Sequence, residues 1–187
     1  MVRNLNNEMP LLPIKVFGRL DAFLMDPERD EIVQEIHTPN TVVDGGEILI
    51  AELLGGEDLA GNPLAYATTG DLGKGLQFCQ VGANGDASTQ GMYGMQDTSG
   101  ITTNNYTTIT VDITSPGNII TAAAQFTYGD GNHATGLREA GLFTNSSDPA
   151  SKTDTSSRMF NRVNFATINK NTTYQLTFNW TITIGTV

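Results

Sequence analysis

The stretch YQLTFNWTITI, residues 174–184, alternates apolar and polar side chains without interruption. One face carries Tyr174, Leu176, Phe178, Trp180, Ile182 and Ile184, and the other carries only Gln, Thr and Asn. A period of two with β-branched and aromatic residues is typical of a half-buried β-strand. Eleven residues would span roughly 37 Å, which is long for a strand. We therefore expect this strand to cross a whole sheet and to bring the single tryptophan into the main core.

Strand patterns dominate the rest of the chain. LQFCQV, NYTTITVDI, NIITAAAQFTYG, GLREAGLFT and RMFNRVNFATI are separated by stretches rich in Gly, Asn and Asp, which favour turns. One segment differs, because Asp44 and Glu47 form a capping box and Ile48, Ala51 and Leu54 follow at helical spacing before Gly55. The pattern predicts a mainly β fold, an antiparallel β-sandwich or jelly-roll-like domain with one short helix near residues 45–54.

The chain divides into three predicted parts. Residues 1–15 have no periodicity and contain Pro10 and Pro13, so they are expected to form an extended N-terminal arm. Residues 16–39 are expected to form a β-hairpin, because Asp26 and Pro27 favour a turn between two strand-like runs. Residues 40–187 are expected to form the sandwich domain.

Charge restricts the possible partners. The 187 residues include 20 acidic and 10 basic ones, a net charge of −10, and the lysines and arginines are not clustered. Nucleic acid and anionic membranes carry charge of the same sign as this surface, so we do not expect them as partners. No apolar run approaches the ~20 residues that span a bilayer. The first residues do not form a secretory signal, so the chain is expected to remain in the cytoplasm where it is made.

Reactive residues are few and scattered. Cys79 lies in an apolar run, where a buried structural role is expected. His37 and His133 are not at metal-ligand spacing and are expected to be solvated loop residues. The GDLGKG stretch at residues 70–75 lacks the Ser or Thr and the helix of a phosphate loop. We therefore expect no enzymatic activity, cofactor or metal site.

Loop carboxylates leave one alternative open. Asp86, Asp97 and Asp130 lie in glycine-rich loops and could bind calcium or a sugar, although turn formation is the commoner role. With Tyr93 or Tyr106 they would suit a carbohydrate-binding sandwich.

Three segments together resemble small structural proteins of tailed-bacteriophage virions. They are GRLDAFLMDPERDEIVQEIHTPNTVVDGGEILIAELLGG, LQFCQVGANG, and REAGLFT followed by SRMFNRVNFATINKNTTYQLTFNWTITI. The last of these is similar to the C-terminal part of the family, which has a Glu-Xaa-Gly-Leu-Phe strand, an Arg-containing strand, a Lys-bearing turn and an alternating strand with Trp. The resemblance covers residues 16–56 and about 137–184. Its usual Gly-x-Gly is loosened to Gly82-Ala83-Asn84-Gly85, and the middle of the chain departs most.

The resemblance implies a β-rich virion component without enzymatic activity, assembled in the host cytoplasm. The expected function is capsid decoration, with the major capsid protein or other virion proteins as partners and a homo-oligomeric state. A neck, tail or baseplate role in the same virion is the alternative. The arm and the strand after it would add to a neighbour's sheet edge. The expected interaction residues are Leu11, Leu12, Ile14, Val16 and Phe17.

Overall fold

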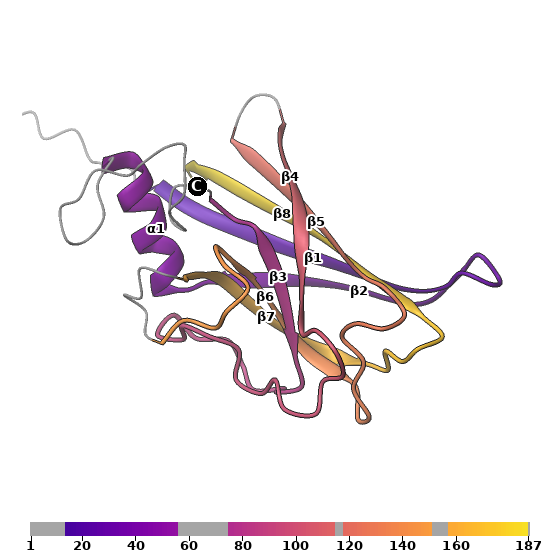
Figure 1. Cartoon of the computed structure of the whole chain (residues 1–187). Helices are drawn as coiled ribbons and strands as arrows, with labels where there is room; N and C mark the ends of the chain where they lie inside the picture. The colour runs from indigo at the N-terminus through magenta and orange to yellow at the C-terminus, as the bar shows by residue number, and fades with distance from the viewer. Residues whose placement is uncertain (1–13, 56–74, 115–117, 151–156, 187) are drawn as a thin grey trace, which may run out of the picture.

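Eight antiparallel strands close into one barrel in the computed structural model, which describes residues 14–55, 75–114, 118–150 and 157–186 (Figure 1). Around the barrel the order is β1-β2-β7-β6-β3-β4-β5-β8. The elements are β1 (Ile14–Asp26), β2 (Glu31–Val42), α1 (Asp44–Gly55), β3 (Phe78–Gly82), β4 (Tyr106–Thr114), β5 (Ile119–Phe126), β6 (Leu137–Phe143), β7 (Met159–Ile168) and β8 (Gln175–Thr186).

β8 is the strand predicted from the alternating segment, and it lies between β1 and β5. It pairs with β1 from Ile14↔Thr186 to Met25↔Gln175, and with β5 from Ile119↔Thr183 to Phe126↔Leu176. The apolar face is buried as expected, because Leu176, Phe178, Trp180 and Ile182 are all 0% exposed. On the opposite face Thr181 is only partly buried and Asn179 is exposed.

Large and small side chains alternate across the three strands around β8. Trp180 stands between Leu20 of β1 and Ala122 of β5. Phe178 stands between two alanines, Ala22 and Ala124. The small residues leave room for the aromatic rings, which is how a close-packed core accommodates its largest members. The two buried alanines of β5, Ala122 and Ala124, are therefore a packing feature.

The mainly β, antiparallel fold with one short helix is confirmed. The finer expectation of a two-sheet sandwich or jelly roll is not confirmed, because hydrogen-bonded pairing continues around all eight strands. Closure depends on β2, which pairs with β1 as far as Asn40 and then with β7 through Thr41 and Val42. A strand that changes partner in this way can link two sheets into a barrel.

The predicted hairpin at residues 16–39 forms most of β1 and β2, and both strands belong to the barrel. Its turn lies where expected: the Asp26 carboxylate accepts hydrogen bonds from the backbone N–H groups of Glu28 (3.1 Å) and Arg29 (3.4 Å). Asp30 closes the turn with φ of 52°, a conformation that Asp tolerates better than most residues. Of the predicted arm, residues 1–13 lie outside the described part of the chain, and β1 begins at Ile14.

The predicted helix near residues 45–54 is α1, which packs against β7 (Figure 1). Its acidic residues Asp44 and Glu47 lie in the first turn, where they favour the helix dipole. The helix approaches the sheet closely at Gly46, because a Cβ there would overlap the carbonyl oxygen of Phe160. Glycine at this position therefore sets the distance between α1 and β7.

Replacing Trp180 with alanine should destabilise the protein by about 3–5 kcal/mol, because it removes a buried aromatic side chain and leaves a cavity. Thr181→Ala, on the opposite face of the same strand, is the matched control and should cost less than about 1 kcal/mol. Urea unfolding of the two full-length variants measures both values. Equal losses would mean that the outer face of β8 is also packed, and a small loss at Trp180 would contradict the core described above.

Candidate functional site

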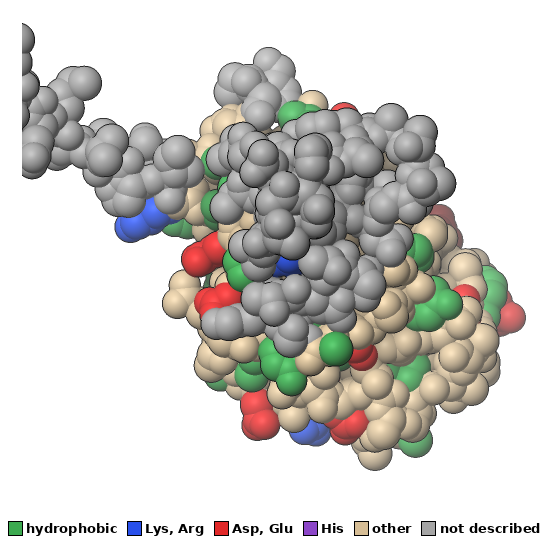
Figure 2. Space-filling view, turned by 60° about the vertical axis from the view of Figure 1, so that its left-hand side comes forward, with side chains coloured by type: hydrophobic (Ala, Val, Ile, Leu, Met, Phe, Trp, Pro, Cys, Tyr) green, Lys and Arg blue, Asp and Glu red, His purple; other side chains and the backbone are tan. Residues whose placement is uncertain are grey.

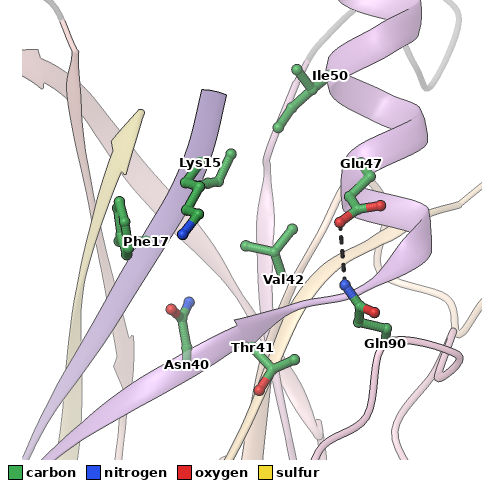
Figure 3. Close-up of a pocket in the computed structure, with 9 residues that line it drawn as sticks. Lys15, Phe17, Asn40, Thr41, Val42, Glu47, Ile50 and Gln90 are labelled. Atoms are coloured by element: carbon green, nitrogen blue, oxygen red, sulfur yellow. Dashed lines mark hydrogen bonds between the residues drawn. The ribbon is translucent and has the colours of Figure 1, made fainter. Parts of the chain in front are cut away.

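A groove of about 590 Å³ opens where β1 and β2 separate. It is lined by Lys15, Val16, Phe17, Asn40, Thr41, Val42, Glu47, Ile50 and Gln90. In Figure 3, Lys15 and Phe17 of β1 lie across from Glu47 and Ile50 of α1, and β2 runs between them. We call this site the β1–β2 groove.

The groove exists because the two strands take different partners. The last β1–β2 pair is Gly18↔Asn40, after which β2 pairs with β7 at Thr41↔Arg162 and Val42↔Asn161. Ile14–Phe17 continue to pair with β8 on their other side. Among the described strands none pairs with Ile14–Phe17 on the side that faces β2. One backbone edge of these four residues therefore faces the groove, and such an edge is a template for an added strand.

The base of the groove is apolar. Val16, Val42 and Ile50 are partly buried and pack against the main hydrophobic core. They come from β1, β2 and α1, so the helix supplies one wall. An inserted apolar side chain would thus contact the existing core.

Asn40 supplies an unusual polar group at the fork. Its side chain lies over Gly18, where a Cβ would overlap the amide. Both amide atoms, Oδ1 and Nδ2, are buried and make no hydrogen bond. A buried amide without partners costs about 1–3 kcal/mol, and it carries one acceptor and two donors that a change of side-chain rotamer would turn towards the groove.

The wall opposite β1 is held by hydrogen bonds between α1 and the loop that contains Gln90. The Asp44 N–H donates to the carbonyl oxygen of Gln90 (2.8 Å), and Gln90 Nε2 donates to Glu47 Oε1 (3.4 Å; Figure 3). Glu47 thus places a negative charge on this wall, across from Lys15 on β1. Within the described residues Lys15 has no ion-pair partner.

A buried ion pair between β6 and β7 holds the same loop in place. Arg162 Nε of β7 donates to Glu139 Oε2 of β6 at 2.6 Å, and both side chains are 0% exposed. Glu139 also accepts hydrogen bonds from the backbone N–H groups of Gln96 (3.1 Å) and Asp97 (2.9 Å). Arg162 Nη1 donates to the carbonyl oxygen of Asp86 at 3.1 Å. The pair therefore anchors this loop on both sides of Gln90, at Asp86 and at Gln96 and Asp97.

Lys170 acts in the same way on another loop. Its Nζ is buried and donates to the carbonyl oxygens of Thr127 (2.8 Å) and Asn171 (3.1 Å) and to Asn132 Oδ1 (2.8 Å). Burial lowers the pKa of Lys170 to about 8. Glu139, Arg162 and Lys170 thus hold loops in place by buried hydrogen bonds.

Only some of the predicted interaction residues line the groove. Val16 and Phe17 line the groove, and Phe17 is 46% exposed. Ile14 begins β1, while Leu11 and Leu12 lie outside the described residues. Asn40, Ile50 and Gln90 are not among the predicted interaction residues, because their proximity depends on the path of β2. The Gly18↔Asn40 pair that marks the fork is a feature of the strand register and has no local sequence pattern.

The histidines are placed differently from the expectation of solvated loops. His37 lies within β2, where Nδ1 contacts Asp21 Oδ1 (2.6 Å) and Nε2 contacts Glu35 Oε1 (2.7 Å). Burial opposes ionisation of Asp21, but hydrogen bonds from His37 and Arg19 outweigh it and lower the pKa of Asp21. His133 is in a loop but only partly exposed, with Nδ1 3.1 Å from the carbonyl oxygen of Gly136.

The loop aspartates make local hydrogen bonds. Asp97 Oδ1 accepts hydrogen bonds from the Ser99 hydroxyl (2.5 Å) and from the Ser99 N–H (3.0 Å), and these two bonds lower the pKa of Asp97. Asp130 Oδ1 accepts from Asn104 Nδ2 at 3.1 Å. Within the described ranges no group of three or more His, Cys, Asp or Glu residues could hold a metal ion. Of the two tyrosines named with these aspartates, Tyr106 packs edge-on against Phe78, and Tyr93 is 45% exposed.

Comparisons of the chain with known protein families, with curated proteins and with solved structures find no match. Among the described residues, no helix has the length and apolar character that crossing a bilayer requires. On the side of the molecule drawn in Figure 2, the described hydrophobic and charged side chains are scattered, without a broad basic patch. The groove is therefore the strongest guide to function.

Removing either member of the buried ion pair should be costly. Glu139→Gln or Arg162→Met should each destabilise the protein by about 3–5 kcal/mol, because a buried charge or its donors lose their partner. The double variant should lose less than the sum of the two, since the groups interact directly. Denaturant unfolding of all three variants tests this, and additive losses would contradict the coupling.

Ionisation of Cys79 should affect stability only at alkaline pH. Burial raises the pKa of its thiol from 9.0 to about 12. Above pH 9 the unfolded thiol ionises first, so the folded state binds more protons and its stability falls as pH rises towards 12. Cys79→Ala should therefore lose less stability than the wild type over pH 9–12. Parallel stability curves for the two proteins would contradict the raised pKa.

Proposed function

We propose that this chain is a non-enzymatic structural protein of a tailed-bacteriophage virion, and that it serves as a capsid decoration protein on the major capsid shell. The observation that carries the assembly role is the β1–β2 groove. There, Val16 and Phe17 adjoin the unpaired backbone edge of a barrel strand. An exposed strand edge over an apolar base is suited to holding an extended segment of another protein.

The sequence resemblance supplies the virion context. Its closing segments form β6, β7 and β8, and their Glu, Arg, Lys and Trp residues are buried in the barrel and its loop anchors. Residues of this kind maintain a fold, so the resemblance supports a shared architecture. The position of the protein in the particle is tested by its copy number.

The acidic surface is compatible with this role. A net charge of −10 makes the surfaces of two copies repel each other wherever no specific contact forms. It also disfavours binding to the packaged nucleic acid, whose phosphates carry the same sign. Attachment through the groove would depend on local backbone and apolar contacts, which do not require complementary charge.

A neck, tail or baseplate position is the second candidate, because a strand-accepting groove serves any of these assemblies. Particle stoichiometry distinguishes the two. Capsid decoration requires a copy number comparable with that of the major capsid protein, whereas a neck or tail ring requires far fewer copies.

The test is quantitative mass spectrometry of tailed particles purified from cells that produce this chain. We expect the protein to co-purify with the particles in a fixed ratio to the major capsid protein. A ratio typical of a ring component would transfer the proposal to the neck or tail. Absence from intact particles would overturn the virion role.

A further inference from the structure

We propose that the β1–β2 groove binds the N-terminal arm, residues 1–13, of a second copy of this chain as an additional short strand. The inference rests on the proposed assembly role and names the partner. Three features of the groove match an extended peptide: a free backbone edge, an apolar base and an unpartnered amide.

The free edge sets the size of the added strand. Ile14–Phe17 offer four residues of backbone to the groove, about 14 Å at the usual rise of a strand. The segment Met9-Pro10-Leu11-Leu12 has this length. Pro10 lacks an N–H group, which is tolerated at the side of a strand that makes no ladder hydrogen bonds.

The apolar base suits either register of the arm. Neighbouring side chains of a strand point to opposite faces. Because Leu11 and Leu12 are adjacent, either register directs one leucine towards Val16, Val42 and Ile50. The other leucine then lies near the exposed ring of Phe17.

Asn40 adds a polar contact that the apolar base cannot provide. Its amide carries both a donor and an acceptor, as a peptide group does, and both atoms lack a partner. A backbone entering beside the fork would satisfy them. The arm would thus remove a buried polar defect that the isolated chain contains.

The arm of the same chain is a poor occupant, because Pro13 immediately precedes β1. To enter its own groove the chain would have to reverse direction there. Two-residue hairpin turns require positive φ, whereas proline fixes φ near −65° and favours an extended residue before it. A longer loop would use Leu11 and Leu12 in the turn.

Reach and charge favour a neighbouring copy. Thirteen extended residues span roughly 40 Å, enough to reach an adjacent barrel. The arm carries one basic residue, Arg3, and one acidic residue, Glu8, so it is neutral. Exchange of arms therefore links two acidic barrels without bringing a further acidic surface into the groove.

Disulfide trapping between two full-length chains of different tag size tests the proposal. Both chains carry Cys79→Ala. One also carries Leu12→Cys in the arm, or Leu11→Cys to sample the other register, and its partner carries Thr41→Cys in the groove. The control partner carries Thr181→Cys, which is similarly accessible but lies on the outer face of β8.

Mild oxidation should give a mixed-chain disulfide with Thr41→Cys well above the level with Thr181→Cys. A single chain carrying both Leu12→Cys and Thr41→Cys should form intermolecular products. Intramolecular cross-links alone would assign the groove to the chain's own arm and overturn the proposal. Cross-linking no stronger than that of the control in both registers would also overturn it.

Asn40→Ala separates binding from folding. It should weaken association about fivefold to tenfold, as expected for the loss of one to two net hydrogen bonds, measured by sedimentation. It should leave the stability of the dissociated chain unchanged or raised, because an unsatisfied amide is removed. Unchanged association would contradict the role of Asn40. Particle stoichiometry is measured independently, so failure of cross-linking and failure of the virion role are distinguishable.

Discussion

The structure depends on the pairing of β8 with β1 on one side and β5 on the other. These two ladders place Trp180 between Leu20 and Ala122, and they bring the first described strand against the last. The barrel wall and the largest part of the core are therefore formed by the same contacts. The groove depends on them as well, because β8 is the one described strand that pairs with Ile14–Phe17.

Buried charges complement this apolar core by fixing the loops. Glu139 and Lys170 make most of their hydrogen bonds to loop backbone. Arg162 contacts the same loop as Glu139 through one backbone carbonyl oxygen and two side chains, those of Asp86, Ser88 and Met92 respectively. Taking such groups out of water is expensive, and apolar replacements of a buried pair are often no less stable. Their value here is positional: they define where glycine-rich loops lie, and through Gln90 they fix one wall of the groove.

Local patterns in the sequence predicted the strands, the helix and the turn, because period-two alternation, helix capping and Asp-Pro chemistry act over a few residues. Barrel closure could not be predicted in this way, since it depends on β2 exchanging β1 for β7 after Asn40. The residues that line the groove come from both kinds of pattern. Val16 and Phe17 belong to the predicted interaction set because of their local apolar character, whereas Asn40, Ile50 and Gln90 meet through long-range packing. His37 is exposed as expected, but it lies in a strand because β2 continues past Pro39 to Val42.

Pairing of β1 with β8 also determines the order of folding events. Hairpins such as β1–β2 form in about 1–10 μs, whereas contacts between distant parts of a chain slow folding to milliseconds or longer. The Ile14↔Thr186 ladder is such a contact, and ribosomal synthesis must deliver β8 before it can form. The edge of Ile14–Phe17 is therefore ordered only after the barrel has closed. Nascent and partly folded chains lack this formed edge, so the proposed association would be restricted to molecules that have completed folding.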